Sequence, residues 1–184
     1  MECVNATHQR KISMIYYISD PHFYHTNIIE LANRPFSNVY EMNNVLIGKW
    51  NRKVNKGDRV FIIGDFSLGT KEQTLKILNK LNGEKILIRG NHESVIDYAE
   101  VKSKFGFIKD YYCKDKIVMS HYPFMSWRGK HNGYIHLYGH THNNYPPLRI
   151  EGAYNCCVEV NNYEPCTLDE IIENNNIWWN KCET

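Results

Sequence analysis

Short polar blocks that carry aspartate, asparagine and histidine follow apolar, β-prone runs along this chain, and their order constrains the fold more than any other feature. In an α/β sheet, the loops that follow the strands lie along one edge, so side chains far apart in sequence converge there. The pattern therefore predicts an α/β fold with one polar site at a sheet edge. The blocks are Asp20-Pro21-His22, Gly64-Asp65, Gly90-Asn91-His92-Glu93, His121 and Gly139-His140-Thr141-His142.

Strand and helix periodicities alternate over most of the chain, which supports the α/β class. Thr70 with Gln73, and Thr167 with Glu170, have the spacing of a capping box, which favours helix starts at these threonines. We expect strands over residues 15–19, 59–63, 85–88, 116–119, 134–138 and 153–160. We expect helices over residues 26–33, 42–55, 70–83 and 95–105, and a last helix from residue 167.

Length and composition fit a single domain. The chain has 184 residues, of which 42% are hydrophobic, and no repeat or linker divides it. We expect one domain over residues 14–184 and a flexible N-terminal extension over residues 1–13, with Met14 as an alternative natural start.

Charge and hydropathy exclude several classes of protein. The net charge is +2, from 22 Lys+Arg and 20 Asp+Glu scattered along the chain, so no extended nucleic-acid groove or membrane-binding surface is expected. No apolar stretch reaches the roughly 20 residues that cross a bilayer, and the first thirteen residues have no signal-peptide core. We therefore predict a cytoplasmic protein whose six cysteines stay reduced.

The side chains of the polar blocks are those that bind divalent metal ions. Mixed imidazole, carboxylate and amide ligands suit Mn²⁺, Fe²⁺, Zn²⁺ or Ni²⁺, of which we favour Mn²⁺. Seven such ligands at one place suit two ions that share a bridging carboxylate and keep positions open for water and substrate. The candidate ligands are Asp20, His22, Asp65, Asn91, His121, His140 and His142.

The motifs differ in how specific they are. A D-x-H such as Asp20-Pro21-His22 is expected about 0.3 times by chance in a chain of this composition, so it is weak evidence alone. The block Gly90-Asn91-His92-Glu93 is expected only about 0.004 times. Taken singly, a strand-end aspartate or histidine is more often a turn cap than a ligand, whereas the complete ordered set favours a metal site.

With these blocks in this order, the sequence resembles the calcineurin-like metallophosphoesterases over residues 14–160. Segments such as Asn33-Arg34-Pro35-Phe36 and Asp65-Phe66-Ser67-Leu68-Gly69 also resemble the small single-domain phosphoesterases of bacteria and their phages. The resemblance implies a four-layer αββα sandwich. It also implies a first metal ion held by Asp20, His22, Asp65 and His142, and a second held by Asp65, Asn91, His121 and His140.

The resemblance assigns catalytic roles to Asp65 and His92. Asp65 bridges the ions, a metal-bridging hydroxide attacks the phosphorus, and His92 assists the leaving group. Many members carry an aspartate shortly after the G-D block that orients this histidine, but residues 66–69 contain none. Glu93 and Asp97 are the alternatives for this role, or His92 acts as a phosphate-binding cation.

Four further residues are candidate substrate contacts. Arg89 follows a strand, and Arg34 follows the first short helix. Trp127 and Arg128 lie on an expected loop that could stack a base and hold a phosphate. A structural role is the alternative for each of them.

Three other polar residues are given lower weight. We interpret His25 as a surface histidine at a helix start, close enough to reach the rim of the site. Asn51 is a candidate for orienting a ligand, with a structural role as the favoured alternative. His136 is expected to be structural.

These features favour a two-metal phosphodiesterase. Because no segment forms an added cap domain, we expect an accessible pocket for a nucleotide-sized diester, such as a cyclic nucleotide or an oligonucleotide end. The alternatives are a phosphomonoesterase, including a protein phosphatase, and a non-catalytic metal-binding scaffold. The expected partner is a small phosphate ester, a nucleotide or a nucleic-acid end, with no membrane and with homo-oligomerisation left open.

Overall fold

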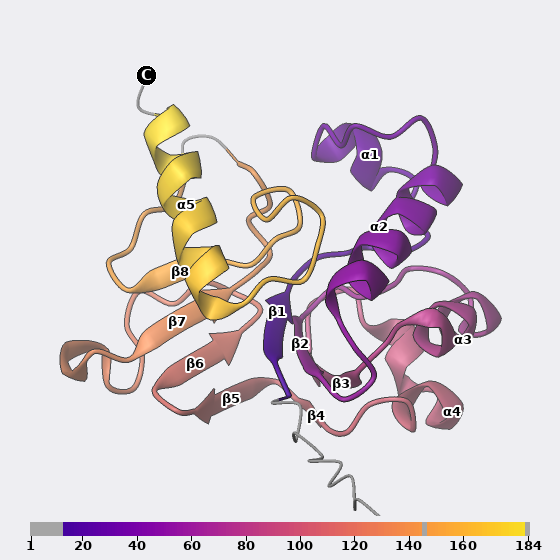
Figure 1. The fold of residues 1–184 in the computed structure, drawn as a ribbon, viewed down its shortest axis with the longest axis horizontal. Coiled ribbons are helices and arrows are strands. Elements are labelled where there is room, and N and C mark those ends of the chain that lie inside the picture. Colours follow the sequence, from indigo (N-terminus) through magenta and orange to yellow (C-terminus); the bar gives the residue numbers. More distant parts are fainter. Residues whose placement is uncertain (1–12, 145–146, 183–184) are drawn as a thin grey trace, which may run out of the picture.

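The computed structural model describes residues 13–144 and 147–182, which form two four-stranded sheets packed face to face (Figure 1). The first sheet is parallel, in the order β1 (Ile15–Ile18), β2 (Arg59–Ile63), β3 (Glu84–Ile88) and β4 (Ile108–Lys109). In the second sheet β5 is antiparallel to β6 and the other pairs are parallel. Its order is β5 (Tyr111–Lys114), β6 (Ile117–Ser120), β7 (Ile135–Tyr138) and β8 (Ala153–Asn155).

Helices flank the two sheets. Helices α2 and α3 cover the outer face of the first sheet, and α5 packs beside β8 of the second (Figure 1). This is the four-layer αββα arrangement that the sequence predicts. The helices are α1 (Ile28–Leu31), α2 (Val39–Lys53), α3 (Lys71–Lys80), α4 (Ala99–Lys102) and α5 (Leu168–Cys182).

The central strand β2 is buried on both faces. Val60 and Ile62 pack with Trp50 of α2, whereas Phe61 and Ile63 face the second sheet. Burial of each large apolar side chain in this way stabilises the folded state by roughly 1.5–3 kcal/mol. A parallel strand between two layers needs such an unbroken apolar run, which is why the sequence predicted β2 correctly.

Side-chain caps fix the starts of two helices. The Thr70 side chain accepts from the backbone N–H of Gln73, and the Gln73 side chain accepts from Thr70, so the predicted capping box is confirmed. Helix α2 begins at Val39, three residues earlier than predicted, because Asn38 Oδ1 accepts from the backbone N–H groups of its first turn.

The strand predicted over residues 153–160 ends at Asn155. The Asn155 side chain accepts from the backbone N–H of Cys157 at 2.8 Å, which turns the chain out of the second sheet. The backbone N–H of Ser19, directly after β1, then donates to Cys156 O at 2.8 Å. The segment after β8 therefore joins the two sheets.

The helix predicted over residues 95–105 is also interrupted. A 3₁₀ turn spans Ser94–Asp97, and the extended backbone of Tyr98, with a ψ of 129°, separates it from α4. Strands β4 and β5 were not predicted, because β4 pairs through only two residues and has no readable alternation.

Within the two described ranges, no helix is long and apolar enough to span a bilayer. The cysteines at positions 113, 156, 157, 166 and 182 are free thiols. Burial raises the pKa of the Cys156 and Cys157 thiols well above the ordinary value. The expected extension lies, except for Ser13, outside the described residues.

His136 is a buried residue of β7 beneath the loop that carries Phe124 and Trp127. Its Nε2 accepts from the backbone N–H of Phe124 at 3.0 Å, and its Nδ1 lies 3.2 Å from Val118 O. Burial lowers the pKa of His136 from 6.5 to about 4, so the folded protein keeps this ring neutral. His136 therefore has the structural role that the sequence predicts.

We expect His136 to make the folded state less stable in acid. Between pH 6.5 and about 4 the unfolded chain binds a proton that the folded chain does not, so the unfolding free energy decreases as the pH falls, by about 3 kcal/mol in all. Urea unfolding of metal-free protein across this window should give a shallower pH slope for His136→Gln than for the wild type. The control His131→Gln changes an exposed histidine and should keep the wild-type dependence of unfolding free energy on pH. Equal pH slopes for the wild type and both variants would contradict the prediction.

Candidate metal centre

Five of the seven candidate ligands lie in strained turns that directly follow strands β1, β2 and β7. A positive φ is uncommon outside glycine and costs about 1–3 kcal/mol, and such residues cluster at functional sites. The turns therefore mark this edge of the molecule as the candidate site. The φ angles are 55° for Asp20, 51° for His22, 52° for Asp65, 68° for His140 and 46° for His142.

Two glycines of the polar blocks leave room for the ligand carboxylates. A Cβ on Gly90 would overlap the Asp65 carboxylate, and a Cβ on Gly139 would overlap Ser19 Oγ and the Asp20 carboxylate. This close packing explains the glycine that stands in each of these blocks.

Asp65 lies at the centre of the site. Its Oδ2 is 3.5 Å from His22 Nε2 and 3.6 Å from His121 Nε2. Asp20 Oδ1 is 3.5 Å from the same His22 nitrogen and 3.7 Å from His142 Nε2. Ligand atoms that each lie about 2.0–2.2 Å from one ion are separated by roughly 3–3.6 Å, so these spacings are those of a cation site.

A second group of ligand atoms surrounds the other side of Asp65. His121 Nε2 lies 2.9 Å from Asn91 Oδ1, and the His140 ring centroid is 5.1 Å from that of His121. The structure thus brings all seven candidate ligands together in two groups that share Asp65. Asp20 and His121 are buried beneath the others, which line an open pocket.

The chemistry of these atoms fits two divalent cations. Asp20 Oδ1 and His22 Nε2 are buried and make no hydrogen bond with any described residue, although they face each other across 3.5 Å. Buried polar atoms without partners are costly, and a bound cation between them would satisfy both. The nitrogen and oxygen donors are those expected for Mn²⁺, Fe²⁺, Zn²⁺ or Ni²⁺.

Hydrogen bonds to Asp20 determine which of its two carboxylate oxygens is left for a cation. Asp20 Oδ2 accepts from Ser19 Oγ and from the backbone N–H of His140 at 2.9 Å, which leaves Oδ1 for a cation. Burial opposes ionisation of Asp20, but the nearby imidazoles, first among them His22, outweigh burial and lower the pKa of the carboxyl. Asp20 is therefore ionised at neutral pH.

Hydrogen bonds also fix the metal-facing nitrogen of two histidines. His121 Nδ1 lies 3.0 Å from Ile63 O, and His142 Nδ1 lies 2.9 Å from Glu159 Oε1. Each Nδ1 thus carries the proton, and each Nε2 keeps a lone pair for a cation. Glu159 is a site residue that sequence reasoning missed, because no motif marks it.

Arg34, predicted as a substrate contact, instead lies fully inside the protein. Its guanidinium forms a 2.7 Å ion pair with Glu159, and both side chains are at most 1% exposed. It also donates to the backbone oxygens of Asp20 at 2.7 Å and Pro21 at 3.0 Å. Arg34 therefore holds Glu159 and the turn after β1, and it cannot reach a substrate.

Replacing Arg34 by methionine should destabilise the metal-free protein by about 3–5 kcal/mol, since the Glu159 carboxylate would stay buried without its guanidinium partner and with only the His142 imidazole beside it. Chemical denaturation measures this loss. Arg52→Met is the matched control: Arg52 is 70% exposed and 3.6 Å from Glu164, so its loss should cost less than about 1 kcal/mol. A loss for Arg34→Met no larger than the control would contradict the structural role.

His92 lies at the mouth of a pocket of about 290 Å³ that opens over the ligands. Its backbone N–H donates to Asp65 Oδ1 at 2.9 Å, and its ring centroid is 5.9 Å from that of His22. The pocket continues past the ligands along α1. Its lining consists of His22, His25, Ile28, Leu31, Ala32, Asp65, Asn91, His92, His140, His142 and Asn144.

The two carboxylates suggested to orient His92 have other partners. Glu93 is buried and its Oε1 accepts from the backbone N–H of Phe66, and burial raises the pKa of Glu93 to about 7. Asp97 forms a 3.0 Å ion pair with Arg89. Neither carboxylate therefore takes the place of the missing aspartate.

The remaining predicted contacts lie outside this pocket. Arg89 is held by Asp97, and Trp127 is buried with its Nε1 donating to Tyr134 O at 2.8 Å. Arg128 is absent from the pocket lining. Asn51 binds the backbone at the end of α3, donating to Lys80 O and accepting from Asn82 N, so its role is structural.

His25 lies closer to the site than the sequence indicated. It lines the pocket, and its Nδ1 is 3.2 Å from His22 Nδ1. Burial, with repulsion from His22 and His92, lowers the pKa of His25 to about 4, so the ring is neutral at pH 7. The spacing of three residues from His22 was the available signal.

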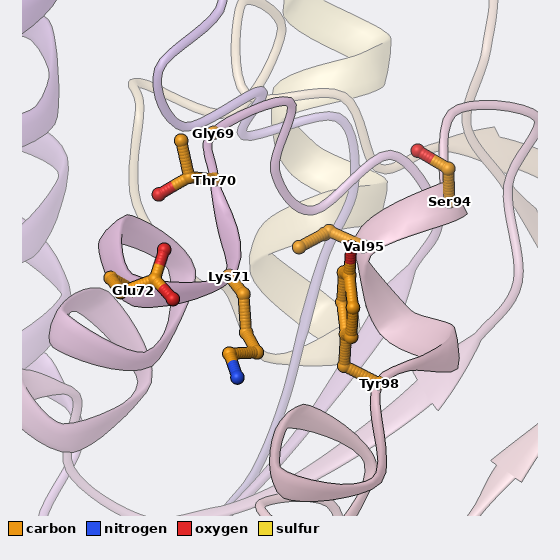
Figure 2. A pocket seen from close by; sticks show the side chains of 7 residues that line it. All are labelled: Gly69, Thr70, Lys71, Glu72, Ser94, Val95 and Tyr98. Carbon is orange, nitrogen blue, oxygen red and sulfur yellow. The ribbon is translucent and has the colours of Figure 1, made fainter.

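A second pocket, of about 550 Å³, lies between the start of α3 and the turn after His92 (Figure 2). Lys71 and Tyr98 face each other across it, with Nζ 5.6 Å from the ring centroid. Lys71 also pairs with Glu100 at 3.3 Å. This pocket contains none of the candidate ligands.

Comparisons with known proteins agree with this geometry. The family model of the calcineurin-like phosphoesterases matches residues 14–182. The uncharacterized protein MJ1445 of Methanocaldococcus jannaschii is 40% identical over 166 residues, covering 86% of this chain and 89% of that protein. The Gene 66 protein of Mycobacterium phage D29 is 28% identical over 162 residues, covering 71% of this chain and 79% of that protein.

A solved structure is also similar. The crystal structure of AQ665, a protein of unknown function from Aquifex aeolicus, has a TM-score of 0.69 at 31% identity and covers 88% of this chain and 98% of that one. Calcineurin-like phosphoesterases are hydrolases of phosphate esters that bind two divalent metal ions. On the match that spans both sheets and every candidate ligand, the chain belongs to the calcineurin-like phosphoesterase family.

Proposed function

We propose that this protein is a two-metal phosphodiesterase that hydrolyses a nucleotide-type diester, such as a cyclic nucleotide or an oligonucleotide end. The observation that carries the proposal is that Asp65 is shared by two groups of ligand atoms, in one of which the buried atoms Asp20 Oδ1 and His22 Nε2 face each other without a hydrogen-bond partner among the described residues. The pocket of about 290 Å³ over these atoms suits one nucleotide-sized group.

The ligands divide between two ion positions. In this proposal Asp20, His22 and His142 hold one ion, Asn91, His121 and His140 hold the other, and Asp65 holds both. Two divalent ions at these positions supply a clamp on the phosphate oxygens and a lowered pKa for the attacking water.

His92 supplies the proton for the leaving oxygen in this proposal. Its backbone bond to Asp65 fixes the loop, and its ring lies on the open side of the ligands, where it lines the pocket. A general acid at this position stabilises the departing alkoxide, which is the least stable product of ester cleavage.

The side chains around the two proposed ion positions favour a diester over a monoester. Among the described residues that line the pocket there is no lysine or arginine, and the nearby Arg34 and Arg89 are already paired with carboxylates. A phosphomonoester carries about two negative charges at neutral pH and a diester carries one. Beyond the ligands, Ile28, Leu31 and Ala32 form an apolar wall that can contact the second ester group.

Hydrolysis of two model esters tests the proposal. Metal-stripped protein restored with Mn²⁺ should cleave bis-p-nitrophenyl phosphate faster than p-nitrophenyl phosphate, and a chelator should stop both reactions. Faster cleavage of the monoester would favour a phosphatase, including a protein phosphatase. Two bound metals without turnover of either ester, cyclic nucleotides or short oligonucleotides would favour a binding scaffold instead.

A further inference from the structure

His25 is the one titratable residue, among the described residues that line the pocket, that has no role in the proposed mechanism. Its backbone N–H donates to His22 O at 3.0 Å, which turns the chain back so that the two imidazoles meet. Their Nδ1 atoms are 3.2 Å apart, and their ring centroids are 5.1 Å apart. His25 thus touches a candidate metal ligand from the pocket side.

The contact between the two Nδ1 atoms determines where the protons are. In such a pair one nitrogen must donate and the other must accept. His22 Nε2 faces Asp20 Oδ1 and Asp65 Oδ2, each at 3.5 Å, and needs its lone pair if it holds a cation there. The proton of His22 is then on Nδ1, so His25 Nδ1 accepts it and the proton of His25 is on Nε2.

Three of the four candidate histidine ligands are therefore held by different hydrogen-bond partners. His121 is held by a backbone oxygen and His142 by the buried Glu159. His22 is held by His25, whose own ring lines the pocket and lies 6.3 Å from the His92 ring. A bound phosphate in the pocket can accept a hydrogen bond from this Nε2–H donor.

We propose that His25 is a positioning residue that holds His22 in its metal-binding tautomer and, as a result, presents a fixed Nε2–H donor to a phosphate group. This inference rests on the proposed metal site. In this inference the contact between the His22 and His25 imidazoles links the first metal position to the bound phosphate.

Three substitutions separate the two parts of this role. His25→Leu removes both nitrogens. His25→Asn places Oδ1 where Nδ1 was and so keeps the acceptor, but it loses the distal donor. His25→Gln places a polar group near the former Nε2 and loses the acceptor beside His22.

Mn²⁺ binding to metal-stripped protein, measured by calorimetry without any ester, tests the first part. We expect His25→Leu and His25→Gln to weaken one of the two sites about 10–100-fold, and His25→Asn to stay close to the wild type. Thermal melts of the metal-free variants check that each one folds. Wild-type affinity in His25→Leu, or equal weakening in His25→Leu and His25→Asn, would overturn the tautomer role.

Binding of inorganic phosphate to the Mn²⁺-loaded protein tests the second part. Although it holds both metals, His25→Asn should bind phosphate about tenfold more weakly than the wild type, because it has lost a hydrogen bond to an anion. Unchanged phosphate affinity would overturn the donor role. Neither measurement needs turnover, so a wild type that cleaves no diester would contradict the proposed function while leaving this inference supported.

Discussion

Asp65→Asn should reduce ester hydrolysis by at least about a thousandfold, the largest effect expected of any single substitution in this protein. Asp65 Oδ1 accepts from the backbone N–H of His92, and Oδ2 faces His22 and His121. If the asparagine oxygen keeps the bond to His92, its NH₂ group faces both ion positions and cannot bind a cation. Metal content after dialysis and the turnover rate together measure the loss.

The control for this experiment is Asp110→Asn, which makes the same chemical change on a side chain that is 90% exposed. It should retain both metals and full activity. Two tightly bound metals in Asp65→Asn would show that Asp65 does not bridge them, and near-normal turnover would contradict the proposed site altogether.

His92→Ala should keep both metals but slow the cleavage of esters with poor leaving groups by about 10²–10⁴-fold. The backbone N–H that bonds Asp65 remains in the alanine variant, so the ligand loop keeps its anchor. The loss should be much smaller for p-nitrophenyl esters, because p-nitrophenolate leaves without a proton. Comparing one alkyl and one p-nitrophenyl diester measures this difference.

His131→Ala, at an exposed position, should behave like the wild type with both diesters. An equal loss in His92→Ala for the two leaving groups would assign His92 to phosphate binding, and loss of a metal would assign it to the ligand set. Either result would contradict its role as the proton donor.

The sequence predicted the elements that are specified locally. Four of the five residues of β2, Val60 to Ile63, form an apolar run, and the start of α3 is fixed by Thr70 and Gln73, so both elements can be predicted without knowledge of the rest of the fold. β4 could not be predicted, because its two residues become a strand only by pairing with β3. The end of β8 depends on a bond from Asn155 to the backbone of Cys157, which strand periodicity does not reveal.

In the candidate site, too, the residues marked by local motifs were predicted, whereas those whose role depends on the fold were not. The ligands follow strands in recognisable blocks, and the structure places all of them together at one edge. Arg34 was misinterpreted because its partner Glu159 is 125 residues away, so a buried ion pair looked like a free cation. The contact of His25 with His22 could not be predicted, because their spacing of three residues does not reveal the backbone turn that brings the two rings together.

The two sheets are made from successive parts of the chain, residues 15–109 and residues 111–155, and neither part contains a complete ligand set. Asp20, His22, Asp65 and Asn91 follow strands of the first sheet, whereas His121, His140 and His142 follow strands of the second. A chain that has folded only one half therefore cannot bind either ion with its full set of ligands. Hydrolytic activity is thereby tied to the docking of the two halves, so a partly synthesised or partly unfolded chain exposes no competent metal centre to the esters around it.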